Sequence, residues 1–146
     1  MAKLTHLEQD VFTDIVTLDY LQLKGIGNGG QLTIGTIPAG GAVELVYIDE
    51  AEAVTGTTSL VIDVGTSEAD PDEFIDALDV DAMTVPVYNT GDEFTTAETE
   101  ANKLILAGVV ATDTPIILEV TDANIDDITA GLIVVGLRII DARRFA

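Results

Sequence analysis

Short runs of alternating apolar and polar residues, each ended by a turn sequence, recur along this chain. The longest run covers residues 42–53 and is followed by Thr55-Gly56-Thr57-Thr58, where glycine tolerates the positive φ values of tight turns. Successive side chains of a strand point to opposite faces of a sheet, so this alternation predicts strands with one buried and one solvated face. The chain is therefore predicted to be all-β.

About eight strands are predicted, separated by turn signals at short intervals, and no helical period is sustained. Besides residues 42–53, the predicted strands cover residues 15–24, 31–37, 60–64, 85–88, 104–110, 115–120 and 132–140. Pro86 places its strand at the edge of a sheet, because proline cannot donate to a hydrogen-bond ladder. A short helix-like run is expected at residues 72–78, with Phe74, Ile75 and Leu78 facing the body of the domain.

This pattern is typical of an antiparallel β-sandwich, and we expect a jelly roll with short helical insertions. An immunoglobulin-like sandwich is the alternative, although the sequence has no Cys pair and no Trp to support it. At 146 residues, a single domain is the simplest organisation. We assign residues 1–14 to an N-terminal arm or short helix and residues 15–146 to one β-sandwich domain.

The charge balance excludes several classes of partner. The chain carries 26 acidic and 6 basic residues, a formal net charge of -20. This charge repels phosphate groups, so direct binding to nucleic acids or to anionic membranes is disfavoured. The chain has no Cys, which excludes disulfides, thiolate metal ligands and thiol nucleophiles. No apolar run approaches the ~20 residues that a membrane-spanning helix needs.

Residues 25–30 match the dinucleotide-binding pattern G-x-G-x-x-G, with Asp49 and Glu50 following at about the expected distance. That motif requires a helix N-terminus after the glycines, where free N–H groups face the pyrophosphate. Residues 31–37 alternate like a strand instead. The glycines are therefore interpreted as a loop or hairpin, and no nucleotide cofactor is predicted.

Two acidic segments resemble metal sites only superficially. Asp122, Asn124 and Asp126 open a calcium-loop pattern, but its sixth position is Asp127 instead of Gly and its twelfth is Ile133 instead of Glu. A solvated turn or helix cap is preferred there. The densest acidic segment has no ligand spacing either, and its carboxylates are Glu68, Asp70, Asp72, Glu73, Asp76, Asp79 and Asp81.

No arrangement of residues indicates catalysis, and we expect neither an enzyme nor a bound cofactor or metal. The single histidine, His6, lies in the weakly patterned N-terminal segment, where a Ser-His-Asp triad would be poorly placed. With 26 acidic residues, some carboxylate pair always resembles a glycosidase site, so such a pair carries no information.

The scarce basic residues are candidates for contacts with other subunits. Three of the 6 lie near the C-terminus, where Arg143 and Arg144 follow the last predicted strand. They either form ordinary surface pairs with the chain's own acids or hold carboxylates of a neighbouring subunit. The candidate contact residues are Lys3, Arg138, Arg143 and Arg144.

One segment resembles a known class of proteins. Residues 59–77, SLVIDVGTSEADPDEFIDA, join an apolar strand and VGT to the acidic sequence ADPD and then to an apolar pair. Matching pieces are Ile37-Pro38-Ala39-Gly40 and Thr129-Ala130-Gly131. Together these pieces span most of residues 32–141, and they resemble the head decoration, or cement, proteins of tailed phages.

The resemblance implies a β-sandwich homotrimer that is made in the host cytoplasm and sits on the outer surface of the capsid. Its partners would be the major capsid protein and further copies of itself, and its role would be to bridge neighbouring capsid subunits. Weak contacts of each protomer would add through multivalency.

Three other functions remain open at this point. A head–tail connector or tail component would occupy another place in the virion. An acidic DNA mimic fits the charge, although residues 104–110 and 132–137 are nearly uncharged. A carbohydrate-binding module is poorly supported, because such sites stack sugars on aromatic rings and this chain has no Trp, 3 Tyr and 4 Phe.

Overall fold

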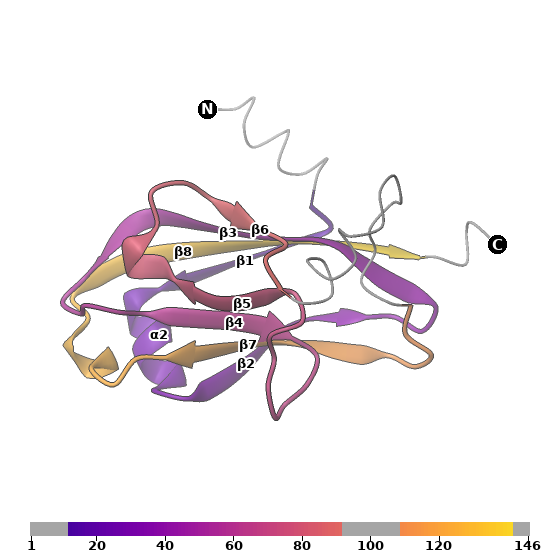
Figure 1. Ribbon diagram of the computed structural model, residues 1–146, viewed down its shortest axis with the longest axis horizontal. Helices are drawn as coiled ribbons and strands as arrows, with labels where there is room; N and C mark the ends of the chain where they lie inside the picture. The colour runs from indigo at the N-terminus through magenta and orange to yellow at the C-terminus, as the bar shows by residue number, and fades with distance from the viewer. Residues whose placement is uncertain (1–11, 92–108, 142–146) are drawn as a thin grey trace.

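The computed structural model describes residues 12–91 and 109–141, which form eight strands in two facing sheets (Figure 1). The strands are β1 (Asp14–Asp19), β2 (Gly30–Ile37), β3 (Gly41–Thr55), β4 (Val61–Gly65), β5 (Ile75–Asp79), β6 (Val87–Tyr88), β7 (Thr114–Thr121) and β8 (Ala130–Asp141). Three short helices are also present, namely α2 (Tyr20–Ile26), η1 (Val80–Ala82) and η3 (Ile125–Asp127).

The strand order is that of a jelly roll. Sheet A has the order β1-β8-β3-β6 and sheet B the order β2-β7-β4-β5. The antiparallel pairs β1·β8, β2·β7, β3·β6 and β4·β5 are nested, as if one long hairpin had been folded over into two layers. The predicted all-β jelly roll with short helical insertions is confirmed, and the immunoglobulin-like alternative is not observed.

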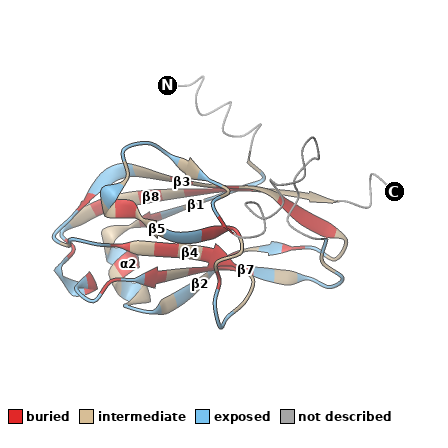
Figure 2. Cartoon of the chain, viewed as in Figure 1, coloured by how far each residue is buried: buried red, intermediate tan, exposed pale blue. Residues whose placement is uncertain are grey.

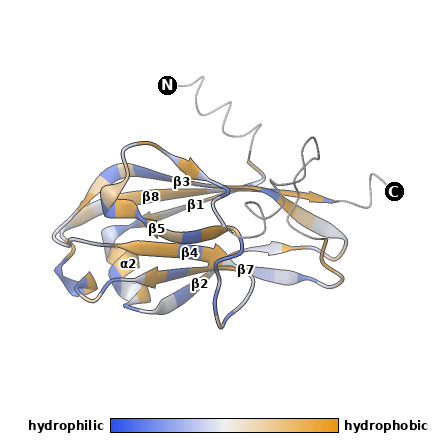
Figure 3. Ribbon diagram, viewed as in Figure 1, coloured by the Kyte–Doolittle hydropathy of each residue, from blue (hydrophilic) through white to orange (hydrophobic). Residues whose placement is uncertain are grey.

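Buried and hydrophobic residues recur along the strands of both sheets (Figures 2 and 3). Their side chains form one core between the two sheets. Leu118 of β7 and Val64 of β4 are cross-strand partners on the inner face of sheet B, and both are fully buried. Leu137 of β8 and Val46 of β3 form the equivalent pair on the inner face of sheet A. The alternation seen in the sequence is thus the alternation between core and outer face.

The predicted strand over residues 15–24 is wrong in its second half, because β1 ends at Asp19 and α2 begins at Tyr20. Asp19 caps this helix: its carboxylate accepts from the Gln22 N–H at 2.8 Å, and the Gln22 side chain accepts from the Asp19 N–H at 2.9 Å. Tyr20, Leu23 and Ile26 pack on the core at a spacing of three residues. This helical spacing, together with the cap, makes residues 20–26 a helix instead of a continuation of β1.

Removal of this cap gives a first prediction. Asp19→Ala leaves N–H groups of the first turn without a partner, so the free energy of unfolding should fall by about 1 kcal/mol. Urea unfolding followed by circular dichroism measures this change. Asp19→Asn keeps a side-chain acceptor and should restore most of the loss. An unchanged unfolding midpoint for Asp19→Ala would contradict the role of the capping box.

The helix-like run predicted for residues 72–78 is also wrong, because residues 75–79 form strand β5 beside β4. The Phe74 N–H donates to the Val64 carbonyl at 2.9 Å, and the Ala77 N–H donates to the Asp63 carboxylate at 2.6 Å. The expected inward orientation holds, since Phe74 and Ile75 are buried and Leu78 packs against the core. A bulge between Ile62 and Val64 breaks the strand period that the sequence would otherwise show.

Other predictions can be compared directly. Among the glycines at residues 25–30, Gly25 lies in the last turn of α2 and Gly30 begins β2, so the predicted loop is confirmed for residues 27–29. The element that follows them is a strand, where dinucleotide binding requires a helix. β6 lies at an edge of sheet A, as Pro86 predicted. The predicted strand 104–110 lies largely outside the described residues. The assignment of residues 1–14 to an arm and 15–146 to one domain stays a prediction, because residues 1–11 and 142–146 lie outside them too.

Candidate interaction surfaces

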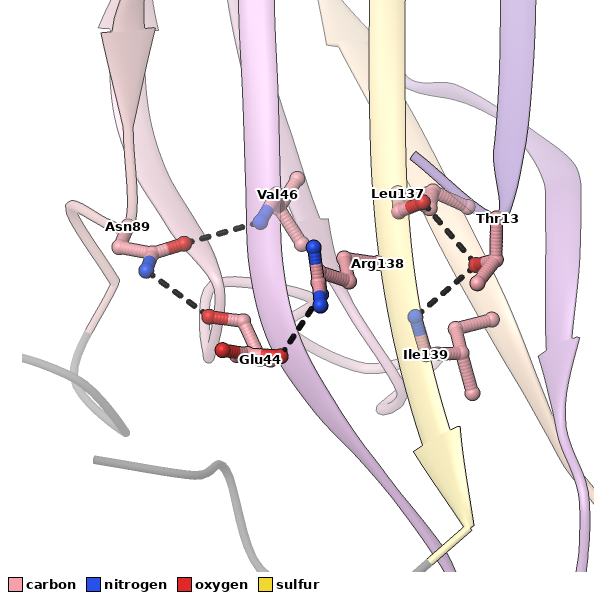
Figure 4. Close-up of polar contacts among 7 residues, drawn as sticks. All are labelled: Thr13, Glu44, Val46, Asn89, Leu137, Arg138 and Ile139. Atoms are coloured by element: carbon pink, nitrogen blue, oxygen red, sulfur yellow. Dashed lines mark hydrogen bonds and ion pairs between the residues drawn. The ribbon is translucent and has the colours of Figure 1, made fainter. Parts of the chain in front are cut away.

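The basic residues predicted as contacts are only partly described. Arg138 lies on β8 and its Nε is 2.9 Å from the Glu44 carboxylate on β3 (Figure 4). Both side chains are partly exposed, so this ion pair contributes at most about 1 kcal/mol to stability. Lys3, Arg143 and Arg144 lie outside residues 12–91 and 109–141, so their proposed contacts are not tested.

Thr13 joins the first described residues to the last strand. Its backbone N–H and its hydroxyl both donate to the Leu137 carbonyl, at 2.8 and 3.1 Å, and its hydroxyl accepts from the Ile139 N–H at 2.9 Å (Figure 4). The hydroxyl thereby replaces a backbone group in the ladder beyond the end of β1. As a result, the pairing of the first strand, β1, with the last strand, β8, extends by one residue to Thr13.

Asn89 follows β6 and hydrogen-bonds the backbone of β3 at the other edge of sheet A. Its backbone N–H donates to the Val46 carbonyl, its side-chain oxygen accepts from the Val46 N–H at 2.9 Å, and its side-chain amide donates to the Glu44 carbonyl at 3.1 Å (Figure 4). Its φ of 50° lies in the left-handed region, which Asn tolerates better than most residues. Because exposed strand edges pair readily with other chains, Asn89 limits such pairing along β3.

The outer face of sheet A carries an apolar row, which we define as Phe12, Ile15, Tyr47 and Tyr88. Ile15 and Tyr47 are both cross-strand partners of Gly136, and Tyr88 is the partner of Tyr47. The row therefore crosses all four strands of the sheet. Ile15 is 43% exposed and Tyr88 is 64% exposed.

Gly136 makes room for one member of the row. A Cβ atom added at Gly136 would lie 2.6 Å from Cε1 of Phe12, so the Phe12 ring rests directly on the backbone of β8. The Phe12 and Tyr47 ring centroids are 5.3 Å apart with a tilted geometry, which is favourable for aromatic pairs. Phe12 thus fills the gap that Gly136 leaves between Ile15 and Tyr47.

The outer face of sheet B is acidic. Glu119 of β7 and Asp63 of β4 are direct cross-strand partners, and the bulged strand β5 adds Asp76 beside them; these three residues are called the acidic row. Like charges placed opposite each other destabilise a sheet. Gln31 of β2 compensates in part, because its side-chain amide donates to the Glu119 carboxylate at 2.7 Å.

Repulsion within this face affects protonation. Burial raises the pKa of Asp63, and the charges of Asp76, Glu119 and Asp70 raise it further, against the opposing hydrogen bond from the Ala77 N–H. The pKa of Asp70 is raised chiefly by the neighbouring charge of Asp72. Both carboxylates are therefore easier to protonate in the folded chain than in the unfolded chain.

A second prediction follows for pH. A carboxyl whose pKa is raised by folding binds its proton more tightly in the folded state, so stability should increase as pH falls from 7 through that raised pKa towards the ordinary value. Asp63→Asn should raise the free energy of unfolding at pH 7 by no more than about 1 kcal/mol, because Asp63 is partly exposed. Its melting temperature at pH 7 should therefore be higher, and should rise less steeply towards pH 4. Asp126→Asn on η3 is the control. A lower melting temperature for Asp63→Asn at pH 7 would contradict this account.

Asp122 lies in the acidic segment that precedes β8. Asp122 forms a turn, with its carboxylate accepting from the Asn124 N–H at 2.8 Å, while its own N–H donates to the Asn28 side chain. The predicted turn is confirmed, but Asp122 itself is buried instead of solvated. In the part of the chain that the structure describes, no three potential ligands are grouped around a metal position. Nor does any helix there have the length and apolarity to cross a membrane.

Comparison with known proteins supports the fold. No protein-family model matches the sequence, and no curated protein matches it. A chain of the cyanophage Pam1 capsid asymmetric unit is similar in structure, with a TM-score of 0.58 and 16% identity over 85% of this chain and 79% of that chain. The chain thus shares its fold with a chain of a phage capsid structure.

Two further phage capsid structures are more distant. A chain of the Ralstonia phage GP4 capsid has a TM-score of 0.46 at 15% identity, covering 88% of this chain and 87% of that chain. A chain of the acidic stable capsid structure of Helicobacter pylori bacteriophage KHP30 has a TM-score of 0.38 at 14% identity, covering 87% of this chain and 88% of that chain.

The apolar row was not predicted from the sequence. Ile15, Tyr47 and Tyr88 each stand in a predicted strand, but no sequence signal says that the three strands are neighbours. The spacing of Phe12 and Gly136 is equally uninformative without the β1·β8 register. The available signal was that large apolar residues stand on both faces of the predicted strand 42–53, with Tyr47 on one face and Val46 and Ile48 on the other.

Proposed function

We propose that this chain is a non-enzymatic structural protein of a tailed-phage virion that decorates the outer surface of the head. It would bind the major capsid protein and cement the shell by bridging neighbouring capsid subunits. The observation that carries the proposal is the jelly-roll fold, similar over 85% of the chain to a chain of the cyanophage Pam1 capsid asymmetric unit. The sequence resemblance of residues 59–77 to head decoration proteins supports the same role.

The described structure is suited to a mechanical role. The two sheets enclose one continuous apolar core, and the nested hairpin topology ties distant parts of the chain together. Such a body resists deformation, because close-packed interiors are only slightly compressible. As a homotrimer, it would engage several capsid subunits at once, so that modest contacts per protomer add through effective concentration.

The proposal is tested with phage heads assembled without this protein. Purified protein is mixed with these heads, and bound copies are counted after sedimentation while light scattering gives the mass of the free protein. We expect trimers in solution, saturable binding in proportion to the number of capsid subunits, and heads that withstand higher temperature after binding.

Three outcomes would contradict the proposal. Failure to bind the heads at any concentration would exclude decoration. A few copies at a single vertex would indicate a head–tail connector instead. A strictly monomeric protein that binds without changing the heat resistance of the heads would exclude the cementing role.

A further inference from the structure

The two outer faces of the sandwich differ in chemical character. On sheet B, the acidic row places Glu119 directly opposite Asp63 and next to Asp76. Covering these carboxylates with another protein would remove them from water and increase their repulsion. On sheet A, the apolar row offers side chains whose burial is favourable instead.

The apolar row has the composition of an interface centre. Tyrosine and phenylalanine are enriched in the cores of protein interfaces, and tyrosine is frequent among residues that dominate binding energy. Tyr88 and Ile15 stand at opposite edges of sheet A with 64% and 43% of their surfaces exposed. Between them, the Phe12 ring packs on Gly136 beside Tyr47, so the row is partly ordered before any partner binds.

Carboxylates border this row. Asp49 lies two residues from Tyr47 on the same face of β3, opposite Val134. One step further along the sheet, Asp19 and Glu52 are both partners of Leu132. On the other side lies the Arg138–Glu44 ion pair. The border is therefore negative overall, and a partner that fits it has an apolar centre surrounded by Lys or Arg.

We propose that the apolar row of sheet A is the surface by which the chain binds the head, and that the acidic row of sheet B faces solvent. The partner is an apolar patch bordered by basic side chains on the outer surface of the major capsid protein. This inference rests on the proposed function. A second copy of the chain fits less well, because it would bring Asp19, Asp49 and Glu52 against an identical set of carboxylates.

The test compares matched variants in binding to heads assembled without this protein. Tyr88→Ser and Ile15→Ser shorten exposed members of the row. Leu21→Ser is the matched control, because Leu21 is apolar and 61% exposed but lies on α2 outside the row. Asp76→Asn alters the exposed part of the acidic row. Circular dichroism and melting temperature identify any variant that fails to fold.

We expect Tyr88→Ser to bind heads about 30-fold more weakly, as for a residue that dominates an interface. The double variant Ile15→Ser/Tyr88→Ser should bind more weakly still, while Leu21→Ser and Asp76→Asn bind like the unchanged protein. Binding of the unchanged protein should weaken as salt rises from about 0.05 M to about 0.5 M. The Debye length shortens over this range, so the attraction between the acidic border and a basic partner is screened more strongly.

The outcomes separate this inference from the proposed function. If the unchanged protein binds heads and the folded row variants bind equally well, the apolar row is not the docking surface, while decoration stands. If the row variants bind heads normally but dissociate an oligomer in light scattering, the row joins copies of the chain and the inference is overturned. If the unchanged protein does not bind heads, both fail.

Discussion

Leu118→Ala is expected to lower the free energy of unfolding by about 3 kcal/mol. Leu118 is fully buried on β7, a central strand of sheet B, between its partners Leu32 on β2 and Val64 on β4. Shortening it removes apolar contact and leaves a cavity, because neighbouring strands on both sides prevent the core from closing around the gap. For a chain of this length, the melting temperature should fall by roughly 10 °C.

Urea unfolding and differential scanning calorimetry measure this loss. Leu21→Ala is the matched control, since the same change at an exposed site on α2 should alter stability by less than about 0.5 kcal/mol. A loss below about 1 kcal/mol for Leu118→Ala would contradict the placement of β7 at the centre of the core.

The second large effect is expected for Gly56→Ala. Gly56 lies in the connection from β3 to β4 with a φ of 93°, which residues with a Cβ atom rarely adopt. A Cβ atom there would also collide with the Asp127 carbonyl, which belongs to backbone and cannot move aside like a side chain. Strain and collision together should cost about 2–4 kcal/mol.

Gly25→Ala provides a control of opposite sign. Gly25 lies inside α2, and a Cβ atom there would meet nothing within 4 Å. Because alanine favours the helix, this variant should gain about 0.5–1 kcal/mol. If thermal unfolding showed the two variants to be equally stable, the close contact of the 55–58 turn with η3 would be wrong.

The fold class could be predicted because local sequence patterns indicate the strands and the turns between them. Alternation indicated the strand β3, and glycine-rich turns separated the strands. Which face of β3 is buried was not predicted, because a bulge between Val43 and Leu45 shifts the period and buries Val43 with Val46. Strand number and turn spacing then favoured a jelly roll among sandwich folds. The nested strand order depends on pairings between strands that are distant in sequence, such as β1 and β8. No local pattern contains such pairings.

The two incorrect elements show where local patterns conflict. Over residues 20–26, Leu21 and Leu23 fit a strand, while Tyr20, Leu23 and Ile26 fit a helix; the Asp19–Gln22 capping box favours the helix. Over residues 75–79, the bulge opposite Asp63 shifts the strand period. A capping box thus selects the helix in the first case, and pairing with β4 across a bulge selects the strand in the second.

The candidate surfaces were predictable only as separate residues. Arg138 was predicted to contact another subunit, and this stays a prediction. The structure pairs Arg138 with Glu44 of its own chain, beside the apolar row. The acidic segment was expected to be solvated, and strand register adds that Glu119, distant in sequence, stands opposite Asp63. The overall charge of -20 does not say where the acidic residues lie. The strand register places the acidic row on the outer face of sheet B and the apolar row on the outer face of sheet A.

The most direct test of the central claim is a cryo-electron microscopy map of the native phage head, with the jelly roll fitted into density. We expect this sandwich on the outer surface of the shell, spanning neighbouring capsid subunits, with sheet A towards the shell and sheet B towards solvent. A head whose outer surface lacks this density, or a map that places the chain at the tail vertex, would contradict the claim.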